Sequence, residues 1–457
     1  MRLYDLIQSN QNLVYIDALT DTSYSVNEFH QSITIEERQA VVFLYTDNMI
    51  GSIEVFLNFL QSRFTVTLLS PQLDIQFKLE LEKAYQPYYI YDPSRTAIDG
   101  FQAYGASNRI QLFRNLSAPA YPVNPEIKLL LSTSGTTGSP KFVKLSEENL
   151  IQNARAILEF LPIEGTDVTP LNVPIIFVYG LSIFTSNCIA GGKMICTNRD
   201  ILQKTFWEDF DHYGCTSIGG VPYVYEMLNR FGFFKREHLS LRYMTQTGGI
   251  LNQTLVQVLA EYGTKHRQQF FVMYGQTEAA GRMAYLPPKD LFTKSTSIGI
   301  PIKNGRFEID PDSNELIYLG ANIFGGYAKS LADLTTFHRA ERLHTGDVAR
   351  KDEDGYYYIT GRIKRIVKLF GTRMNLDEVE LILKNALGGE TFVCLGIEDK
   401  SLLVLHLNEE LAAEAVKQVL KEKLSLHPTM IKVKFVESVP LTPNGKIDYS
   451  TAVQLID

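Results

Sequence analysis

The sequence is organised around the stretch Ser132-Thr133-Ser134-Gly135-Thr136-Thr137-Gly138-Ser139-Pro140-Lys141. An apolar segment, residues 127–131, precedes this stretch and is typical of a buried strand. Ser146, three residues before Asn149, predicts the N-cap of an amphipathic helix over residues 150–160. Glycines let backbone N–H groups converge, hydroxyls add donors and Lys141 adds positive charge, so the pattern predicts a phosphate-binding loop between a strand and a helix. Taken alone, such a tract is also compatible with an ordinary flexible loop.

The loop is not a Walker A loop, because Pro140 stands where a second glycine should precede the lysine. A kinase or ATPase that releases ADP would therefore lack its usual phosphate loop here.

Length and composition bound the class of protein. A chain of 457 residues is too long for one small core, so at least two domains are expected. A net charge of -7 disfavours nucleic acid and anionic membrane surfaces as partners. The first residues lack the apolar core of a signal peptide, and polar residues interrupt the most apolar region, 168–195, so no membrane insertion and a cytoplasmic location are expected. Four cysteines without metal-ligand spacing are expected to be free and buried: Cys188, Cys196, Cys215 and Cys394.

Strand-like and helix-like segments alternate along most of the chain. Residues 40–91 read as strand, helix, strand, helix, strand, and a second series runs from 175 to 274. Such alternation predicts parallel strands joined by helices. After Gly281, short alternating segments punctuated by glycine and proline predict a small antiparallel sheet or barrel.

These patterns predict an α/β fold with two domains. The first, residues 1–363, is a large domain of several subdomains that includes the barrel-like part. The second, residues 364–457, is a mobile α+β domain with helices near 378–386 and 411–424.

Four further clusters follow the opening loop: Tyr274-Gly275-Gln276-Thr277-Glu278, Thr345-Gly346-Asp347, Gly361-Arg362-Ile363-Lys364 and Pro443-Asn444-Gly445-Lys446. Each alone is also compatible with a turn, a loop carboxylate or an exposed hairpin. Together, and in this order, they resemble the AMP-forming adenylating enzymes. That superfamily includes acyl-CoA synthetases, firefly luciferase and the adenylation domains of nonribosomal peptide synthetases, and the resemblance covers residues 41–446.

The resemblance implies an ATP site. It assigns the opening loop to the β- and γ-phosphates of ATP, and Glu278 to Mg²⁺, which prefers oxygen ligands. Thr277 would contact the α-phosphate, and Tyr274 would stack on adenine with Gly275 and Gln276 beside it. Gly248 and Gly249 would lie near the adenine and the acyl group. Asp347 would bind the ribose hydroxyls, and Arg362 would lie near the ribose and phosphates.

The resemblance also implies a mobile catalytic lysine. Lys446 would bridge the substrate carboxylate and the α-phosphate, offsetting the repulsion between two anions. The small domain would then rotate about a hinge at Lys364, since a solvated charge tolerates large dihedral changes. In the rotated state Gly371 would lie along the tunnel for the thiol arm.

The sequence departs from the family pattern at the acyl pocket. Phe177 stands where many family members carry a histidine, and Phe177, Tyr179 and Gly180 are expected to line this pocket. No acidic residue occurs between positions 172 and 190, so a substrate ammonium would lack a partner there and amino-acid activation is disfavoured. The aromatic residues favour an apolar or hydroxylated acid, although they are also compatible with plain core packing.

The resemblance therefore implies an ATP-dependent, AMP-forming ligase. It would activate a fatty, hydroxy or aryl carboxylic acid as acyl-adenylate and transfer it to a thiol. The thiol belongs to coenzyme A or to the phosphopantetheine arm of an acyl carrier protein, which the motifs do not separate. Two alternatives are a stand-alone adenylation protein that loads a carrier protein with an amino acid or another acid, and a non-catalytic nucleotide-binding regulatory homologue.

Overall fold

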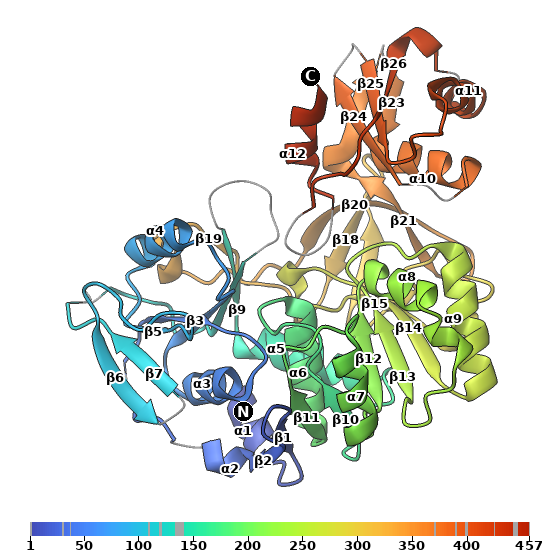
Figure 1. Ribbon diagram of the computed structural model, residues 1–457. Coiled ribbons are helices and arrows are strands. Elements are labelled where there is room, and N and C mark those ends of the chain that lie inside the picture. The colour runs from blue at the N-terminus through green and yellow to red at the C-terminus, as the bar shows by residue number, and fades with distance from the viewer. Residues whose placement is uncertain are drawn as a thin grey trace. The chain divides into compact units, whose positions relative to one another are not determined.

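The computed structural model describes residues 2–29, 32–36, 38–107, 110–117, 121–132, 141–369, 372–388, 391–397, 401–424, 426–441 and 447–456. The described chain divides into two compact units (Figure 1). Unit 1 runs up to residue 307 and includes residues 318–343, whereas unit 2 comprises residues 308–317 and the chain from residue 344 onward. The domain boundary expected at Lys364 stays a prediction.

An eight-stranded sheet in unit 1 has the order β19-β9-β8-β4-β3-β5-β7-β6. Its central strands β3, β4, β5 and β8 pair in parallel, which confirms the arrangement predicted from the first alternating series. The strands are β3 Val41–Tyr45, β4 Thr65–Leu69, β5 Tyr89–Tyr91, β6 Gln102–Ser107, β7 Ile110–Arg114, β8 Leu129–Ser132, β9 Phe142–Leu145 and β19 Tyr327–Ala328. Helices α3 Ile50–Gln61 and α4 Ile75–Tyr85 connect the first of them.

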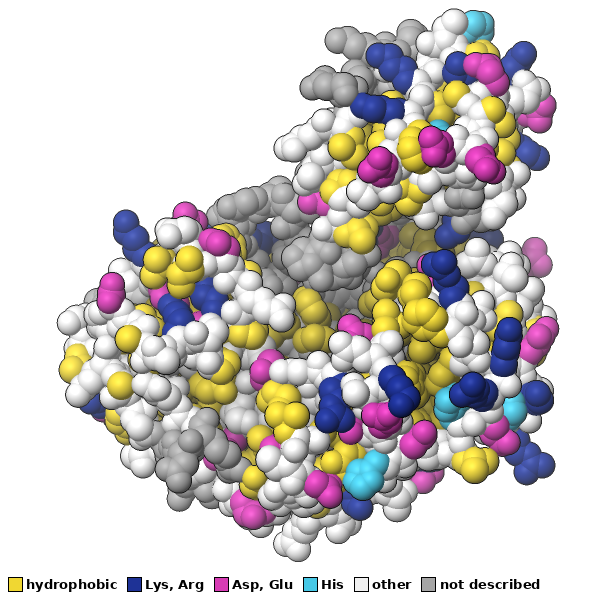
Figure 2. Space-filling view, in the orientation of Figure 1, with side chains coloured by type: hydrophobic (Ala, Val, Ile, Leu, Met, Phe, Trp, Pro, Cys, Tyr) yellow, Lys and Arg dark blue, Asp and Glu magenta, His cyan; other side chains and the backbone are white. Residues whose placement is uncertain are grey.

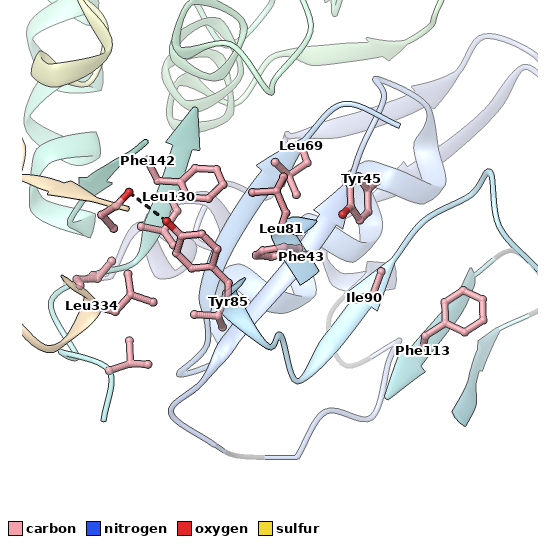
Figure 3. Close-up of a cluster of buried hydrophobic side chains, with 14 of the residues drawn as sticks. Phe43, Tyr45, Leu69, Leu81, Tyr85, Ile90, Phe113, Leu130, Phe142 and Leu334 are labelled. Atoms are coloured by element: carbon pink, nitrogen blue, oxygen red, sulfur yellow. Dashed lines mark hydrogen bonds between the residues drawn. The ribbon is translucent and has the colours of Figure 1, made fainter. Parts of the chain in front are cut away.

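The core on one face of this sheet is built around α4 (Figure 3). Tyr85 of α4 is buried, its ring meets the rings of Phe43 and Phe142 at 6.1 and 5.1 Å between centroids, and its hydroxyl donates to the carbonyl of Ala328 at 3.1 Å. Each large apolar side chain buried in this way contributes about 1.5–3 kcal/mol of folding free energy. The aromatic core therefore packs α4 against β3, β9 and β19.

The sequence pattern predicted a helix after the opening loop, and the structure places the short strand β9 between the loop and that helix. β9 pairs with β8 in antiparallel register, with Ser132 opposite Phe142, so the two ends of the loop lie side by side. The physical reason is burial, because all four β9 side chains are buried, including Lys144, whose ammonium donates to two backbone carbonyls. Helix α5, Glu147–Leu158, follows, and its predicted cap at Ser146 is confirmed by a capping box.

A second large sheet in unit 1 has the order β12-β13-β14-β15-β16. Strands β12, β13 and β14 are parallel and the last two are antiparallel. In Figure 1, α5 and α6 lie between the two large sheets. The elements are α6 Val178–Ala190, α7 Lys204–Tyr213, β12 Ser217–Gly220, α8 Pro222–Arg230, β13 Tyr243–Gln246, α9 Gln253–His266, β14 Gln269–Tyr274, η2 Thr277–Ala279, β15 Ala284–Leu286 and β16 Ile300–Pro301.

A smaller four-stranded sheet completes unit 1, with the order β10-β11-β1-β2. Its strands and the nearby N-terminal helices are α1 Leu3–Gln8, β1 Val14–Asp17, β2 Thr22–Ser25, α2 Val26–Phe29, β10 Val168–Pro170 and β11 Lys193–Cys196.

The sheet β17-β18-β20-β21, most of whose residues belong to unit 2, is the small sheet expected after Gly281. Its strands are β17 Arg306–Ile309, β18 Glu315–Leu319, β20 Leu343–Lys351 and β21 Tyr357–Arg362, and β20 pairs with β21 in antiparallel fashion. The rest of unit 2 contains both predicted helices, α10 Leu376–Ala386 and α11 Ala413–Leu424. The other strands and α-helix here are β22 Ile366–Leu369, β23 Thr372–Asn375, β24 Phe392–Ile397, β25 Ser401–His406, β26 Ile431–Phe435 and α12 Tyr449–Ala452.

The surface is charged and the cysteines are as expected from the sequence. Figure 2 shows basic and acidic side chains interspersed over the visible face. All four cysteines are free and buried, as predicted. In the part of the chain that the structure describes, no helix is both long and apolar enough to span a bilayer.

Candidate active site

Two predicted site segments follow neighbouring parallel strands. β13 leads into Gly248 and Gly249, and β14 leads through Tyr274 into the turn that contains Glu278. Because β13 and β14 are parallel and adjacent, their carboxyl ends lie at one edge of the sheet. The structure therefore brings these two segments together at the edge where parallel sheets bind ligands.

The backbone at this edge requires glycine. A side chain at Gly275 would place its Cβ 1.6 Å from the carbonyl oxygen of Gly281, so the turn closes too tightly for any other residue. Gly248 has φ of +90°, in the left-handed region that glycine adopts without strain. The conformation of the backbone thus favours glycine at position 248, in addition to the role assigned to this residue near the adenine and acyl group.

Two buried asparagines hold the turn after Glu278. Asn153 of α5 donates from Nδ2 to the carbonyl of Arg282 at 2.8 Å. Asn322 donates to the carbonyls of Ala279 and Arg282 at 2.7 and 3.0 Å. The turn that carries Glu278 is therefore preorganised by side chains from distant parts of unit 1.

The Glu278 carboxylate accepts a hydrogen bond from a tyrosine that the motifs did not single out. The hydroxyl of Tyr327 donates to Oε1 of Glu278 at 2.8 Å. Burial raises the pKa of Tyr327, so its hydroxyl stays a donor. The ammonium of Lys141, the last residue of the opening loop, lies 3.5 Å from the centroid of the Tyr327 ring. Tyr327 thus joins a cation and a carboxylate that are both assigned to the phosphates and Mg²⁺.

The donor set fits Mg²⁺ bound chiefly through a nucleotide. Among the described residues, no group of three or more His, Cys, Asp or Glu side chains could hold a metal by itself. Mg²⁺ keeps several waters and commonly binds through one or two carboxylates plus substrate phosphates, a task that Glu278 alone can serve.

Tyr274 and Gln276 are half-buried beside this edge. The Tyr274 ring meets Phe307 at 6.2 Å between centroids, and the Gln276 amide donates to the Tyr274 hydroxyl at 3.5 Å. Thr277 begins the short helix η2.

The predicted acyl-pocket residues lie at the start of α6. Phe177 is the N-cap residue of α6, and Gly180 is obligatory because a Cβ there would lie 2.2 Å from the Pro174 carbonyl oxygen. The buried Tyr179 hydroxyl donates to the carbonyl of Thr245 at 2.7 Å and accepts from the backbone N–H of Gly220 at 3.1 Å. Tyr179 therefore ties α6 to β12 and β13.

In unit 2, the two residues assigned to the ribose lie opposite each other. Asp347 of β20 and Arg362 of β21 are register partners, and Nε of Arg362 lies 3.1 Å from Oδ1 of Asp347. Asp347 is buried, whereas the Arg362 side chain is exposed, so the guanidinium can move while the carboxylate is held.

The predicted hinge residue Lys364 is exposed in the short helix η5, Ile363–Arg365. Its neighbour Arg365 is anchored by ion pairs to Asp377 at 2.8 Å and Glu380 at 2.5 Å, and its guanidinium lies 3.6 Å from the Tyr449 ring centroid. The remaining predicted site residues lie outside the described residues: Thr133, Ser134, Gly135, Thr136, Thr137, Gly138, Gly371 and Lys446.

Sequence reasoning missed Tyr327, Asn153 and Asn322. Tyr327 follows Gly325-Gly326, one of the glycine-rich points after Gly281, and these glycines do not reveal that the next side chain contacts Glu278. Isolated asparagines carry no comparable signal, because their role depends on carbonyls far away in the sequence.

The sequence motifs at the predicted site positions are those of the AMP-forming adenylating class. Comparison with known proteins agrees. Residues 39–328 match the model of the family described as AMP-binding enzyme, and the chain belongs to this family. The resemblance stated from the motifs is thereby confirmed.

Curated relatives are CoA ligases. A probable CoA ligase from Humulus lupulus is 27% identical over 343 residues, which span 70% of this chain and 65% of the relative. A 2-succinylbenzoate–CoA ligase from Staphylococcus epidermidis is 26% identical over 467 residues, spanning 97% of this chain and 95% of the relative. The sequence-based placement in the acyl-CoA ligase branch is confirmed.

Solved structures confirm the predicted fold. The o-succinylbenzoate CoA synthetase of Bacillus subtilis, in complex with its acyl-adenylate intermediate, matches with a TM-score of 0.78 at 18% identity over 100% of this chain and 98% of that one. The same enzyme has been solved with ATP and a magnesium ion, and that structure matches with a TM-score of 0.77 at 17% identity over 99% of both chains.

Proposed function

We propose that this protein joins a carboxylic acid to a thiol in two steps with ATP. In the first, a carboxylate oxygen attacks the α-phosphorus, forming acyl-adenylate and releasing pyrophosphate. In the second, the thiol sulfur attacks the acyl carbon, forming a thioester and releasing AMP. The observation that carries this proposal is the juxtaposition of Glu278, Tyr327 and Lys141, in a chain of the AMP-binding enzyme family.

The residues at the sheet edge are suited to hold ATP for the first step. Tyr327 fixes one oxygen of Glu278, which leaves the other oxygen for Mg²⁺, and Mg²⁺ would neutralise charge on the phosphates. Lys141 and the opening loop would bind the departing pyrophosphate. Gly248 and Gly249 would leave room for adenine, and the Asp347 carboxylate would accept the ribose hydroxyls.

Lys446 would supply the charge for bond formation. Two anions must meet when the carboxylate approaches the α-phosphate, and a positioned ammonium offsets their repulsion. Rotation about Lys364 would then withdraw Lys446 and admit the thiol beside Gly371.

We propose coenzyme A as the thiol, since curated relatives are named CoA ligases. The phosphopantetheine arm of an acyl carrier protein presents the same thiol and is the alternative. Discharge of preformed acyl-adenylate, titrated with free coenzyme A and separately with holo carrier protein, decides between them.

Product analysis tests the reaction itself. The protein is incubated with ATP, Mg²⁺, coenzyme A and a panel of short, long, hydroxy, aryl and dicarboxylic acids that includes 2-succinylbenzoate, the acid in the name of the Staphylococcus relative. AMP and pyrophosphate in equal amounts, with a thioester, are expected. ADP would indicate another phosphoryl-transfer reaction, and ATP binding without turnover would support a non-catalytic regulatory protein.

A further inference from the structure

Arg282 is a buried cation without a carboxylate. The side chain follows the turn that contains Glu278, and the residue is only 2% exposed. Its Nε lies 3.3 Å from the sulfur of Met273, and its guanidinium carbon lies 4.4 Å from the centroid of the Tyr179 ring. Within the described residues, its Nη1 and Nη2 atoms make no hydrogen bond and no acidic side chain pairs with it. Such a cation normally has a charged partner when it is buried.

The backbone of Arg282 is fixed in place. Its N–H donates to Oδ1 of Asn153 at 3.3 Å, and its carbonyl accepts from Asn153 and Asn322. Burial lowers the pKa of Arg282 to about 10, so the side chain remains charged at neutral pH. The protein therefore holds a positive charge at a defined point inside unit 1.

Arg282 lines a narrow cavity between α5, α6 and the second large sheet. The cavity is narrow, with about 20 Å³ of space for the centre of a water molecule, and none of its lining residues is acidic. Part of its wall comes from strands that end at the candidate active site, through Thr245 of β13 and Met273 of β14. Met273 of the cavity wall thus lies next in sequence to Tyr274, the last residue of β14, at the edge where the acyl group would be activated.

The other polar groups in the wall are already paired. Asn172 donates to the carbonyl of Gly219 at 2.6 Å, Thr169 donates to Asn187 at 2.9 Å, and Ser186 donates to the carbonyl of Ser182 at 2.7 Å. These groups pair with the protein itself, whereas the guanidinium Nη atoms do not. Among the described residues, the guanidinium of Arg282 is therefore the charged group in the cavity wall that is free to donate two hydrogen bonds to a ligand. The other polar groups named here already bond to the protein.

Resting on the ligase function proposed above, we infer that the substrate carries a second anionic group, most simply a second carboxylate, that binds Arg282 in this cavity. A planar guanidinium binds a carboxylate through two parallel hydrogen bonds. One carboxylate would be adenylated at the sheet edge while the other pairs with Arg282. The substrate class is accordingly a dicarboxylic acid or an acid with an equivalent distal anion.

The inference is tested by pairing acids that differ only at the far end. Straight-chain α,ω-dicarboxylic acids of increasing length are compared with monocarboxylic acids of the same carbon number, using kcat/KM for AMP formation. A site built to pair a substrate group rejects analogues that lack it by large factors. We expect the best diacid to exceed its matched monoacid by at least about 10²-fold.

Three variants separate recognition from packing. Arg282→Met should lower the ratio of kcat/KM for the diacid to kcat/KM for its matched monoacid to about one, and Arg282→Lys should retain part of this ratio because the charge remains. Arg95→Met is the matched control, because Arg95 is also a largely buried arginine of unit 1 but pairs with Glu82 and Asp92. It should leave the diacid preference unchanged.

The possible results of these assays distinguish recognition of a second anion by Arg282 from a purely structural role of Arg282. A wild-type protein that uses matched monoacids as efficiently as diacids overturns the inference and leaves the ligase function standing. A diacid preference that persists in Arg282→Met also overturns it, assigning Arg282 to packing against Tyr179. If no acid yields AMP with the wild-type protein, both the proposed function and this inference fail.

Discussion

Replacing Tyr327 with phenylalanine tests the support of Glu278 directly. The substitution removes the hydroxyl that donates to Oε1 of Glu278 at 2.8 Å, but it keeps the ring that lies under the Lys141 ammonium. A hydrogen bond to a charged group contributes about 1.5–3 kcal/mol, and the partial exposure of Tyr327 reduces this to about 1–2 kcal/mol. Because 1.4 kcal/mol is a factor of ten, the loss corresponds to about 5–30-fold.

We expect this loss in the Mg²⁺ dependence of adenylation. A Glu278 carboxylate that is free to rotate must be ordered when Mg²⁺–ATP binds, so the Mg²⁺ concentration for half-maximal pyrophosphate release should rise by about 5–30-fold. The rate at saturating Mg²⁺ should change much less. Tyr327→Leu serves as the comparison, because it also removes the ring beneath Lys141 and should weaken ATP binding further.

The reasoning would be refuted if Tyr327→Phe showed the wild-type Mg²⁺ dependence. It would equally be refuted by tighter Mg²⁺ binding in the variant, because the hydroxyl would then compete with the metal for Glu278.

Three other predictions concern the catalytic lysine, the hinge and the turn. Lys446→Ala should slow pyrophosphate release by on the order of 10²-fold or more, yet spare thioester formation from supplied acyl-adenylate; equal loss of both steps would contradict domain rotation. Lys364→Pro should do the reverse, preserving pyrophosphate exchange and blocking thioester release, and unchanged turnover would remove Lys364 as the hinge. Asn322→Ala should lower the free energy of unfolding by about 1–3 kcal/mol, because it removes one donor from the Ala279 and Arg282 carbonyls and leaves the buried Tyr318 hydroxyl without its acceptor. The exposed Asn229→Ala should change the free energy of unfolding by less than about 0.5 kcal/mol, and urea titrations measure both.

The parallel core was predictable because its signals are local. Residues 41–69 alternate in a way that only a strand, a buried helix and a strand satisfy, and the structure forms β3, α3 and β4 there. The cap at Ser146 was predictable for the same reason, since both partners of the capping box lie within four residues.

Features that depend on distant partners could not be predicted. Lys144 reads as a solvent-facing residue after the loop, but the carbonyls of Asp333 and Thr336 accept from its ammonium and let it be buried in β9. Arg282 likewise reads as an ordinary charged residue, because its burial follows from α6 and β14 packing around it.

The hydrogen bonds of Tyr179 have a consequence for how substrate range can evolve. Its hydroxyl links α6 to the backbone of two strands while its ring lies against Arg282, so truncating Tyr179 would reshape the cavity and loosen the fold together. Ile183 and Ile218 line the cavity, and their side chains contribute mainly bulk. Selection for new acids should therefore accumulate changes at these two positions and leave Tyr179 untouched.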